Sequence, residues 1–423
     1  MQEVLRKFQK WNQKLKELVP LALGVNPRFR ELSPESLAVV ISNQDASIIG
    51  FGTHAQLRQR IVDPSFETRT LRLEGVSLDT RLGSSALSIG TLFFKTPQDS
   101  TQQEEQVLIE YKYQAAPQLF APDQSSASLS SSTTSNSLSP ISSSTSALTL
   151  SQTAEKDEEQ VRQLASLLSS SGTDDLRTLL FRGYVQEKHQ NRYAFIFSFP
   201  SESDHSDPKS LNDIVEHASS IEKFSLPTRF KVAQMIAKTI SAFHADGWVH
   251  KSIQSQSIVF FRDRDNPVGQ PSYQNPYLVD FEYSRPEDAA TLMVQYDSDL
   301  GKDLYRHPDR QGPPRSSFRR SHDLYSLGVV LLEIGVWQTA MSIYKEASAQ
   351  MKKGVYPSPR GIRNIFIDVA KRRVQHHMGP AYLDAVLYCL QGGTSSSTSA
   401  AEKFSMDFYE KVVQALDVKH LLI

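Results

Sequence analysis

Strand-like patterns occupy the first half of this sequence, and helical patterns occupy the second half. Apolar and polar residues alternate in short runs such as residues 106–113 and 192–199, as in half-buried strands. From Ser225 onward, apolar residues recur at helical spacing, for example Val232 and Ile236. Strands followed by helices are typical of an α+β fold. We therefore predict a β-rich lobe, an α-helical lobe and a ligand-binding cleft between them.

The same patterns give the individual elements. Strands are expected at residues 37–42, 48–51, 60–62, 68–73, 86–94, 106–113, 179–185 and 192–199. Helices are expected at residues 158–169, from Ser225 to about 243, and at 323–337, 360–378, 380–390 and 402–417. The β-rich lobe then covers residues 37–200, and the α-helical lobe covers residues 201–423.

A serine- and threonine-rich tract interrupts the β-rich lobe. Residues 125–151 hold 18 Ser or Thr in 27 positions and carry no charge. Such a composition cannot bury enough apolar surface to offset the chain entropy that is lost on folding. We predict a disordered insertion over residues 122–153, which is either a spacer or a target of phosphorylation.

The N-terminal residues have the pattern of an amphipathic helix. Val4, Phe8, Trp11 and Leu15 lie on one face, with Lys and Arg residues between them. We expect this helix, over residues 1–22, to dock on the rest of the chain or to be the remnant or linker of a helical domain.

Charge and cysteine content narrow the class of protein. The 46 Lys and Arg residues balance the 47 Asp and Glu residues, so no overall field attracts nucleic acid. The single cysteine, Cys389, excludes an intrachain disulfide and a CxxC zinc site. No apolar run has the ~20 residues of a membrane span, and the N-terminus does not have the pattern of a signal peptide. We expect an intracellular, cytoplasmic protein whose partners are other proteins.

Several fragments of the sequence, in their order, resemble the motifs of protein kinases. Residues 107–112 resemble the strand that carries the phosphate-pairing lysine. Residues 243–259 resemble a helix end followed by the catalytic loop, and residues 277–282 resemble the metal-binding D-F-G segment. Residues 305–309 and 323–334 are similar to the end of an activation segment and to the central buried helix. The resemblance implies a two-lobed protein-kinase-like fold.

The resemblance also shows which catalytic positions have changed. Ser252 stands in the place of the catalytic aspartate, Gln254 in that of the lysine two positions later, and Ser257 in that of the metal-binding asparagine. A serine hydroxyl does not accept a proton as a carboxylate does, and it is a poorer Mg²⁺ ligand than an amide oxygen. We therefore expect a pseudokinase with a regulatory or scaffolding role in signalling.

Some of the ligand-binding positions are retained. The resemblance makes Lys112 the partner of ATP phosphates and Asp280 a ligand of Mg²⁺. Glu282 replaces the glycine of D-F-G, so it is either a second Mg²⁺ ligand or a solvent-facing residue. The helix glutamate that pairs with the lysine in kinases is hard to place, because Glu158 and Glu159 do not lie on the apolar face.

Other positions define the edge of the nucleotide pocket and the scaffold. By resemblance, the pocket edge is formed by Phe197, Ser198 and Phe199. His250 and Phe281 are expected to stack between the lobes, and Asp323 is expected to accept backbone N–H groups of the catalytic loop. Residues 50–55 and 82–90 contain glycines, but neither has the spacing of a phosphate-binding loop.

The N-terminal residues carry a narrower resemblance. Residues 8–15 are similar to the segment that joins a HeLo or prion-inhibition domain to a kinase-like domain in a group of fungal proteins, and this chain begins inside that segment.

The pseudokinase hypothesis has two alternatives. The first alternative is an atypical active Ser/Thr protein kinase, in which an acid such as Glu282 replaces the lost aspartate. The second is a purely structural protein-interaction module.

Overall fold

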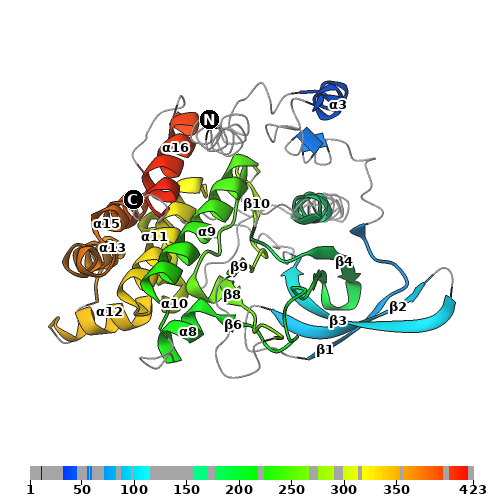
Figure 1. The fold of residues 1–423 in the computed structure, drawn as a ribbon, viewed down its shortest axis with the longest axis horizontal. Coiled ribbons are helices and arrows are strands. Elements are labelled where there is room, and N and C mark those ends of the chain that lie inside the picture. Colours follow the sequence, from blue (N-terminus) through cyan, green and yellow to red (C-terminus); the bar gives the residue numbers. More distant parts are fainter. Residues whose placement is uncertain are drawn as a thin grey trace, which may run out of the picture.

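The computed structural model describes most of the chain outside the serine-rich tract. The described residues are 11, 32–44, 55–56, 58–59, 71–81, 87–96, 99–114, 157–169, 177–217, 223–265, 275–289, 299–312, 317–352, 356–393 and 400–417. The fold is a mixture of α-helices and antiparallel β-sheets. A five-stranded sheet lies on one side of the molecule with the helix of residues 157–169 near it, and the helices from residue 211 onward gather on the other side (Figure 1).

The large sheet has the order β1-β2-β3-β5-β4, and all of its neighbouring strands are antiparallel. Its strands are β1 (Ser77–Arg81), β2 (Ser88–Thr96), β3 (Asp99–Tyr113), β4 (Phe181–Glu187) and β5 (Arg192–Ser198). The sequence predicted β2, β3, β4 and β5 with shifted ends. Alternating side chains of β3 face two separate clusters, because Val107 and Ile109 pack in one and Leu108 packs in the main core.

One helix lies in the chain between β3 and β4, over residues 157–169. Val161, Leu164 and Leu168 are buried in the main core together with Phe195 and Phe197 of the sheet. The helix predicted at residues 158–169 is thus confirmed, and its apolar face packs on the sheet face to which Leu108 belongs.

Short strands and turns connect the sheet to the helical side. They are β6 (Lys209–Ser210), β7 (Trp248–Val249), β8 (Ile258–Phe260), β9 (Tyr277–Leu278), β10 (Arg285–Pro286) and the single turns η1 (Lys188–Gln190), η2 (Ser255–Ser257) and η3 (Pro308–Arg310). β8 pairs with β6 and β9, and β7 pairs with β10. These pairings bring the predicted catalytic loop beside the predicted metal-binding segment.

The helical side is built around α9 (Leu226–Ala245) and α11 (Arg320–Val336). Around them lie α8 (Leu211–His217), α10 (Leu300–Tyr305), α12 (Ala340–Ala349), α13 (Pro359–Val369), α14 (Gln375–Met378), α15 (Pro380–Leu390) and α16 (Ala400–Phe408), with π-helical stretches η4 (Ala370–Val374) and η5 (Tyr409–Gln414). The predicted helices from Ser225 to the C-terminal part are confirmed. Ser225 caps α9, since its side chain accepts the N–H of Thr228.

α11 is the central helix of this side, and nearly all of its residues are buried. Gly328 lets α15 approach closely, because a Cβ at this position would lie 2.8 Å from the Cβ of Cys389. Cys389 itself is buried and free. The sequence predicted this buried helix at residues 323–337, and the structure begins it three residues earlier.

The strand predicted at residues 37–42 is wrong, because these residues belong to the helix α3 (Pro34–Ser42). Ser33 accepts the N–H of Ser36 as N-cap, Pro34 stands at the first helical position, and Glu35 lies in the first turn. This capping chemistry overrides the β-branched residues that suggested a strand.

Other predictions fall outside the described residues. They concern the helix at 1–22 apart from Trp11, the strands at 48–51 and 60–62, the glycine-containing stretch at 50–55 and the insertion at 122–153. The strand predicted at residues 68–73 is described only from residue 71, and Arg72 forms an isolated parallel bridge with Tyr184.

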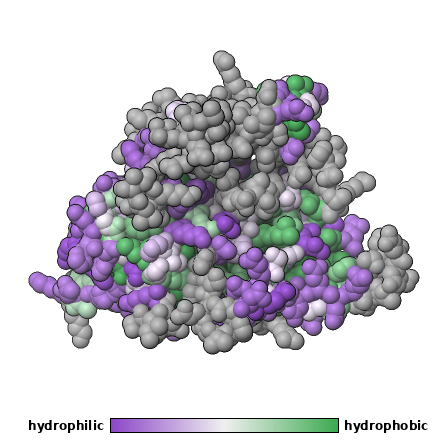
Figure 2. Space-filling view, viewed as in Figure 1, coloured by the Kyte–Doolittle hydropathy of each residue, from purple (hydrophilic) through white to green (hydrophobic). Residues whose placement is uncertain are grey.

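Among the described helices, none has both the length and the apolar composition of a membrane span. α11 and α12 meet both criteria only when they are joined across a bend of 81°. On the face shown in Figure 2, several hydrophobic areas lie among hydrophilic residues.

Candidate functional site

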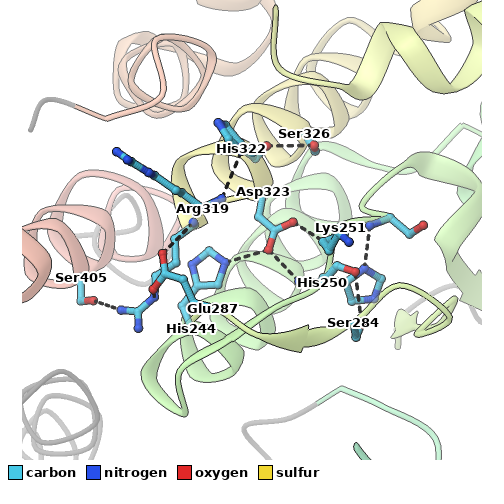
Figure 3. Close-up of polar contacts among 12 residues, drawn as sticks. His244, His250, Lys251, Ser284, Glu287, Arg319, His322, Asp323, Ser326 and Ser405 are labelled. Carbon is cyan, nitrogen blue, oxygen red and sulfur yellow. Dashed lines mark hydrogen bonds and ion pairs between the residues drawn. The ribbon is translucent and has the colours of Figure 1, made fainter. Parts of the chain in front are cut away.

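The predicted catalytic loop runs from His250 to Ser257, between β7 and β8. Asp323, near the start of α11, holds its first residues (Figure 3). The Asp323 carboxylate accepts the N–H of His250 at 2.7 Å and the N–H of Lys251 at 2.9 Å. Lys251 has a φ of +72°, a conformation that costs a non-glycine residue about 1–3 kcal/mol. The two hydrogen bonds therefore stabilise a strained turn.

Further buried contacts fix the same turn (Figure 3). Nε2 of His244 lies 3.1 Å from the Asp323 carboxylate and donates to it. Burial alone would raise the pKa of Asp323, but His244 and His250 hold this pKa below its ordinary value. Ser284 donates to the carbonyl oxygen of His250 at 3.1 Å, and the N–H of Ser252 donates to Nδ1 of His250 at 3.3 Å. The loop is thus held by α9, by α11 and by the segment before β10.

Asp280 follows β9 and faces the catalytic loop. Its φ of +73° is left-handed, so the backbone here is strained as well. Burial raises the pKa of Asp280 to about 6, although the nearby side chain of Ser252 lowers it, and the charge of Glu282 raises it further. The structure therefore places Ser252, at the predicted catalytic position, near the predicted metal ligand Asp280.

Phe281 and His250 stack between the sheet and the helices. Their ring centroids lie 5.0 Å apart in an edge-to-face arrangement, and Phe243 of α9 lies 6.0 Å from Phe281. Burial lowers the pKa of His250 to about 4, so the imidazole is neutral at physiological pH. A neutral, apolar stack of this kind links the predicted metal-binding segment to α9.

The remaining substituted positions bond to one another rather than face outward. The hydroxyl of Ser257 accepts the N–H of Gln254 at 3.0 Å and donates to its carbonyl oxygen at 2.9 Å. This reciprocal pair closes the single turn η2. Ser257 is fully buried, so its oxygen is committed to the loop backbone.

Lys112 lies near the end of β3 and reaches across to the predicted metal-binding segment. Its Nζ donates a hydrogen bond to the carbonyl oxygen of Glu282. Burial lowers the pKa of Lys112 to about 8, although the charges of Glu282 and Asp157 oppose this shift. The ammonium group is thus directed at the segment that Asp280 belongs to.

The helix glutamates considered for Lys112 have other neighbours. Glu158 lies 3.8 Å from Arg72, and Glu159 bonds to Arg162 and to Gln163. The acid of this helix that acts on Lys112 is Asp157, one position earlier than the glutamates that the sequence suggested. The apolar pattern could not reveal it, because that pattern marks only the buried face of the helix.

The backbone of Glu282 lies at the end of β3, where its carbonyl oxygen accepts from Lys112. Burial raises the pKa of the Glu282 carboxyl group, although the nearby charge of Lys112 and the neighbouring Tyr283 and Tyr113 lower it. Among the described residues, no three Asp, Glu, His or Cys side chains lie close enough to hold a metal ion. Asp280 and Glu282 therefore do not form a multidentate cation site with a third such side chain there.

The predicted pocket edge lies at the end of β5. Phe197 is fully buried, pairs with Leu108 of β3, and packs against Phe181 at 5.5 Å between ring centroids. Ser198 pairs with Val107 of β3. Phe199 then leaves the sheet and stacks on His205 at 4.6 Å. These residues connect the sheet to the helical side.

Several positively charged side chains lie near Lys251. Burial lowers the pKa of Lys251 to about 7, and Arg285, Arg310 and Lys112 lower it further. Arg285 donates from one guanidinium nitrogen to the carbonyl oxygens of residues 286, 287 and 289. Its guanidinium group is therefore engaged by the backbone after β10.

Sequence reasoning missed Glu110. Its side chain is 5% exposed, and its Oε2 accepts the N–H of Phe281 at 2.9 Å. Burial raises the pKa of Glu110 to about 8, although the N–H groups of Phe281 and Asp280 oppose the shift. Period-two alternation on β3, with Leu108 and Lys112 on the same face, was the available signal.

Comparison with known protein families shows the family to which this chain belongs. The family model described as a domain of unknown function (DUF7580) matches residues 143–420, which is more than half of the chain. This chain belongs to the DUF7580 family. The match covers β4, β5 and the helical side, with the catalytic loop and Asp280, whereas Lys112 lies before it.

A curated relative is the sporulation protein kinase mde3 of Schizosaccharomyces pombe. The two proteins are 28% identical over 114 residues, which cover 26% of this chain and 19% of the kinase. Part of this DUF7580 protein is thus similar to a fungal protein kinase. The chain spans about a fifth of the length of that relative.

Proposed function

We propose that this DUF7580 protein is a pseudokinase: a two-lobed, protein-kinase-like fold that does not transfer phosphoryl groups and acts in signalling by binding other proteins. The element order supports the fold, because a five-stranded sheet, with the helix of residues 157–169 between β3 and β4, precedes a helical body centred on the buried α11. The similarity to a sporulation protein kinase supports the same relationship.

The observation that carries the proposal is how the hydroxyl of Ser257 is bonded within the predicted catalytic loop. Phosphoryl transfer needs a group that orients the acceptor hydroxyl and another that holds the metal. Ser257, which would assist the metal, accepts the N–H of Gln254 and donates to its carbonyl oxygen instead. The position that would orient the acceptor holds the hydroxyl of Ser252 rather than a carboxylate.

Phosphotransfer with radiolabelled ATP tests this proposal. We expect the wild-type chain to incorporate no more label into itself or into a general protein substrate than the Asp280→Ala variant does. Incorporation by the wild-type chain that Asp280→Ala abolishes would contradict the proposal and favour an atypical Ser/Thr kinase. A Ser252→Ala variant of such an active protein would show whether the hydroxyl takes part.

ATP is the ligand that Lys112 and Asp280 suggest, and we propose that any binding is weak and independent of Mg²⁺. Lys112 must give up its hydrogen bond to the Glu282 carbonyl oxygen before it can pair with a phosphate. The donor set fits Mg²⁺ poorly, because Ser257 is bonded to the loop backbone and, within the described part of the chain, no three Asp, Glu, His or Cys side chains lie close enough to hold a metal ion. We therefore derive no step through a metal ion.

Thermal unfolding with ATP tests the nucleotide claim. We expect a small rise in Tm at millimolar ATP, equal in Mg²⁺ and in EDTA, that is lost in Lys112→Met. Lys231→Met is the matched control, because Lys231 is an exposed lysine of α9. A shift that requires Mg²⁺ would overturn the metal independence, and the absence of any shift would remove nucleotide binding from the proposed function.

A further inference from the structure

Glu110 is a carboxyl group buried in the middle of a sheet. It pairs with Phe195 of β5, and its side chain shares the face of Leu108, which packs in the main core. A carboxyl group on such a face costs several kcal/mol of desolvation unless it is hydrogen-bonded. The burial of Glu110 at this position therefore needs a specific partner.

That partner is the segment that follows β9. The N–H of Phe281 donates to Oε2 of Glu110 at 2.9 Å. Lys112, two residues along the same strand face, donates from Nζ to the carbonyl oxygen of Glu282. We call these two hydrogen bonds the β3 clasp.

The clasp acts on a strained backbone. Asp280, directly before Phe281, has a φ of +73°, which persists only where the surroundings hold it. The ring of Phe281 is fixed by His250, and its N–H is fixed by Glu110. The strand thus supports the backbone, while the helical side supports the side chains.

The helix over residues 157–169 does not supply this support with its glutamates. Glu159 bonds to Arg162, Glu158 lies 3.8 Å from Arg72, and the charge of Asp157 acts on Lys112. Among the described residues, the carboxyl group that bonds to the amide of Phe281 comes from β3.

We propose that Glu110 is the positioning residue of this site, which holds residues 280–282 on β3 through the amide of Phe281. The proposal deepens the proposed function, because it takes Asp280 and Lys112 as the ligand-binding groups. Its consequence is that the conformation of residues 280–282 is coupled to the sheet and is kept without a nucleotide.

Amide hydrogen exchange of residue 281 in the full chain tests the proposal, with two substitutions of similar volume. Glu110→Gln keeps an acceptor oxygen at the same reach, whereas Glu110→Met keeps the volume and removes the acceptor. We expect exchange at Phe281 to be roughly tenfold faster in Glu110→Met and close to wild type in Glu110→Gln. A residue that only filled space would be replaced equally well by methionine.

Matched controls separate a local effect from unfolding. Glu104→Met and Glu104→Gln change an exposed glutamate of the same strand and should leave exchange at Phe281 unchanged. Amides of α11 serve as the internal reference for global opening. If Glu110→Met does not fold, Glu110→Asp, which keeps the charge and shortens the reach by one methylene, should show the same acceleration.

Two results would overturn the positioning role. One is wild-type protection of Phe281 in the methionine or aspartate variant, and the other is an equal loss of protection in Glu110→Gln. The ATP thermal shift is read separately on the wild-type chain. Its absence would remove nucleotide binding and leave the exchange result valid, whereas unchanged exchange would reject the role of Glu110 even if ATP binds.

Discussion

The hydroxyl of Tyr305 donates a hydrogen bond of 2.7 Å to the carboxyl group of Glu333, which is fully buried in α11. The same Oε1 accepts the N–H of Ala340 at 2.7 Å, and Ser255 of the catalytic loop bonds to both side chains. This network joins α10, α11 and the start of α12 to the predicted catalytic loop. It also holds the buried carboxyl group of Glu333, whose pKa burial raises.

The Glu333→Gln variant should change how stability depends on pH. Burial raises the pKa of Glu333 from 4.5 to about 7 in the folded chain. Between these values the folded state retains a proton that the unfolded state has lost, so this group stabilises the fold at low pH and loses that effect as pH rises. We expect the unfolding free energy of Glu333→Gln, relative to wild type, to increase by up to roughly 3 kcal/mol from pH 4.5 to 7.5.

Urea denaturation at several pH values measures this difference. Glu346→Gln is the control, since the side chain of Glu346 is 61% exposed. A constant difference between Glu333→Gln and wild type across the range would contradict the buried, protonated state of Glu333.

The Asp323→Ala variant should lose the order of the predicted catalytic loop. It removes the acceptor for the N–H groups of His250 and Lys251 and for His244, and it leaves these buried donors unsatisfied. We expect a loss of roughly 3–5 kcal/mol in unfolding free energy. Asp309→Ala, at a side chain that is 56% exposed, should cost under about 0.5 kcal/mol. Equal stability of the two variants in guanidinium titrations would show that Asp323 does not hold the loop.

The Phe281→Ala variant should break the stack between the sheet and the helical side. Phe281 is 2% exposed and packs on His250 and Phe243. Removal of a buried ring of this kind costs about 3–5 kcal/mol, and Phe281→Leu should cost about half as much. Thermal unfolding of both variants measures the effect. A fall in Tm for the alanine variant that is no larger than for Leu300→Ala, at a partly exposed site, would argue against the stack as a core element.

The Gly328→Ala variant should push α11 and α15 apart. The added Cβ would lie 2.8 Å from the backbone nitrogen of Leu390 and at the same distance from the Cβ of Cys389, and neither atom can move without its helix. We expect a destabilisation of about 1–3 kcal/mol or more, in spite of the better helix propensity of alanine. Gly301→Ala in α10 is the control, because its nearest neighbour is the end of the Asp299 side chain at 3.2 Å. A gain in stability at Gly328, measured by chemical denaturation, would contradict the close approach.

Periodicity predicted the elements that have strong local signals. The apolar stripes of α9 and α11 and the alternation in β3 and β5 were sufficient, because each requires only the spacing of residues along one element. The prediction was wrong where local capping opposes the residue type, as in α3, in which Ser33 and Pro34 start a helix among β-branched residues.

The sequence predicted contacts in the candidate site only where a short motif identifies the residues that make them. The sequence indicated that Asp323 binds loop amides and that His250 stacks on Phe281, and the structure has both contacts. It did not indicate the partner of Lys112 or the role of Glu110, because their partners lie about 170 residues away and one of them is a backbone carbonyl.

The sequence by itself determined most of the order of strands and helices and the serine at position 252, where the kinase resemblance leads one to expect an aspartate, because both are read from residue types and local spacing. Only the tertiary structure decided which groups Lys112 and Glu110 meet. Lys112 bonds to the carbonyl oxygen of Glu282, and Glu110 bonds to the amide of Phe281. The physical reason is that these partners are backbone atoms, which every residue carries, so chain folding alone selects which of them meets a given side chain.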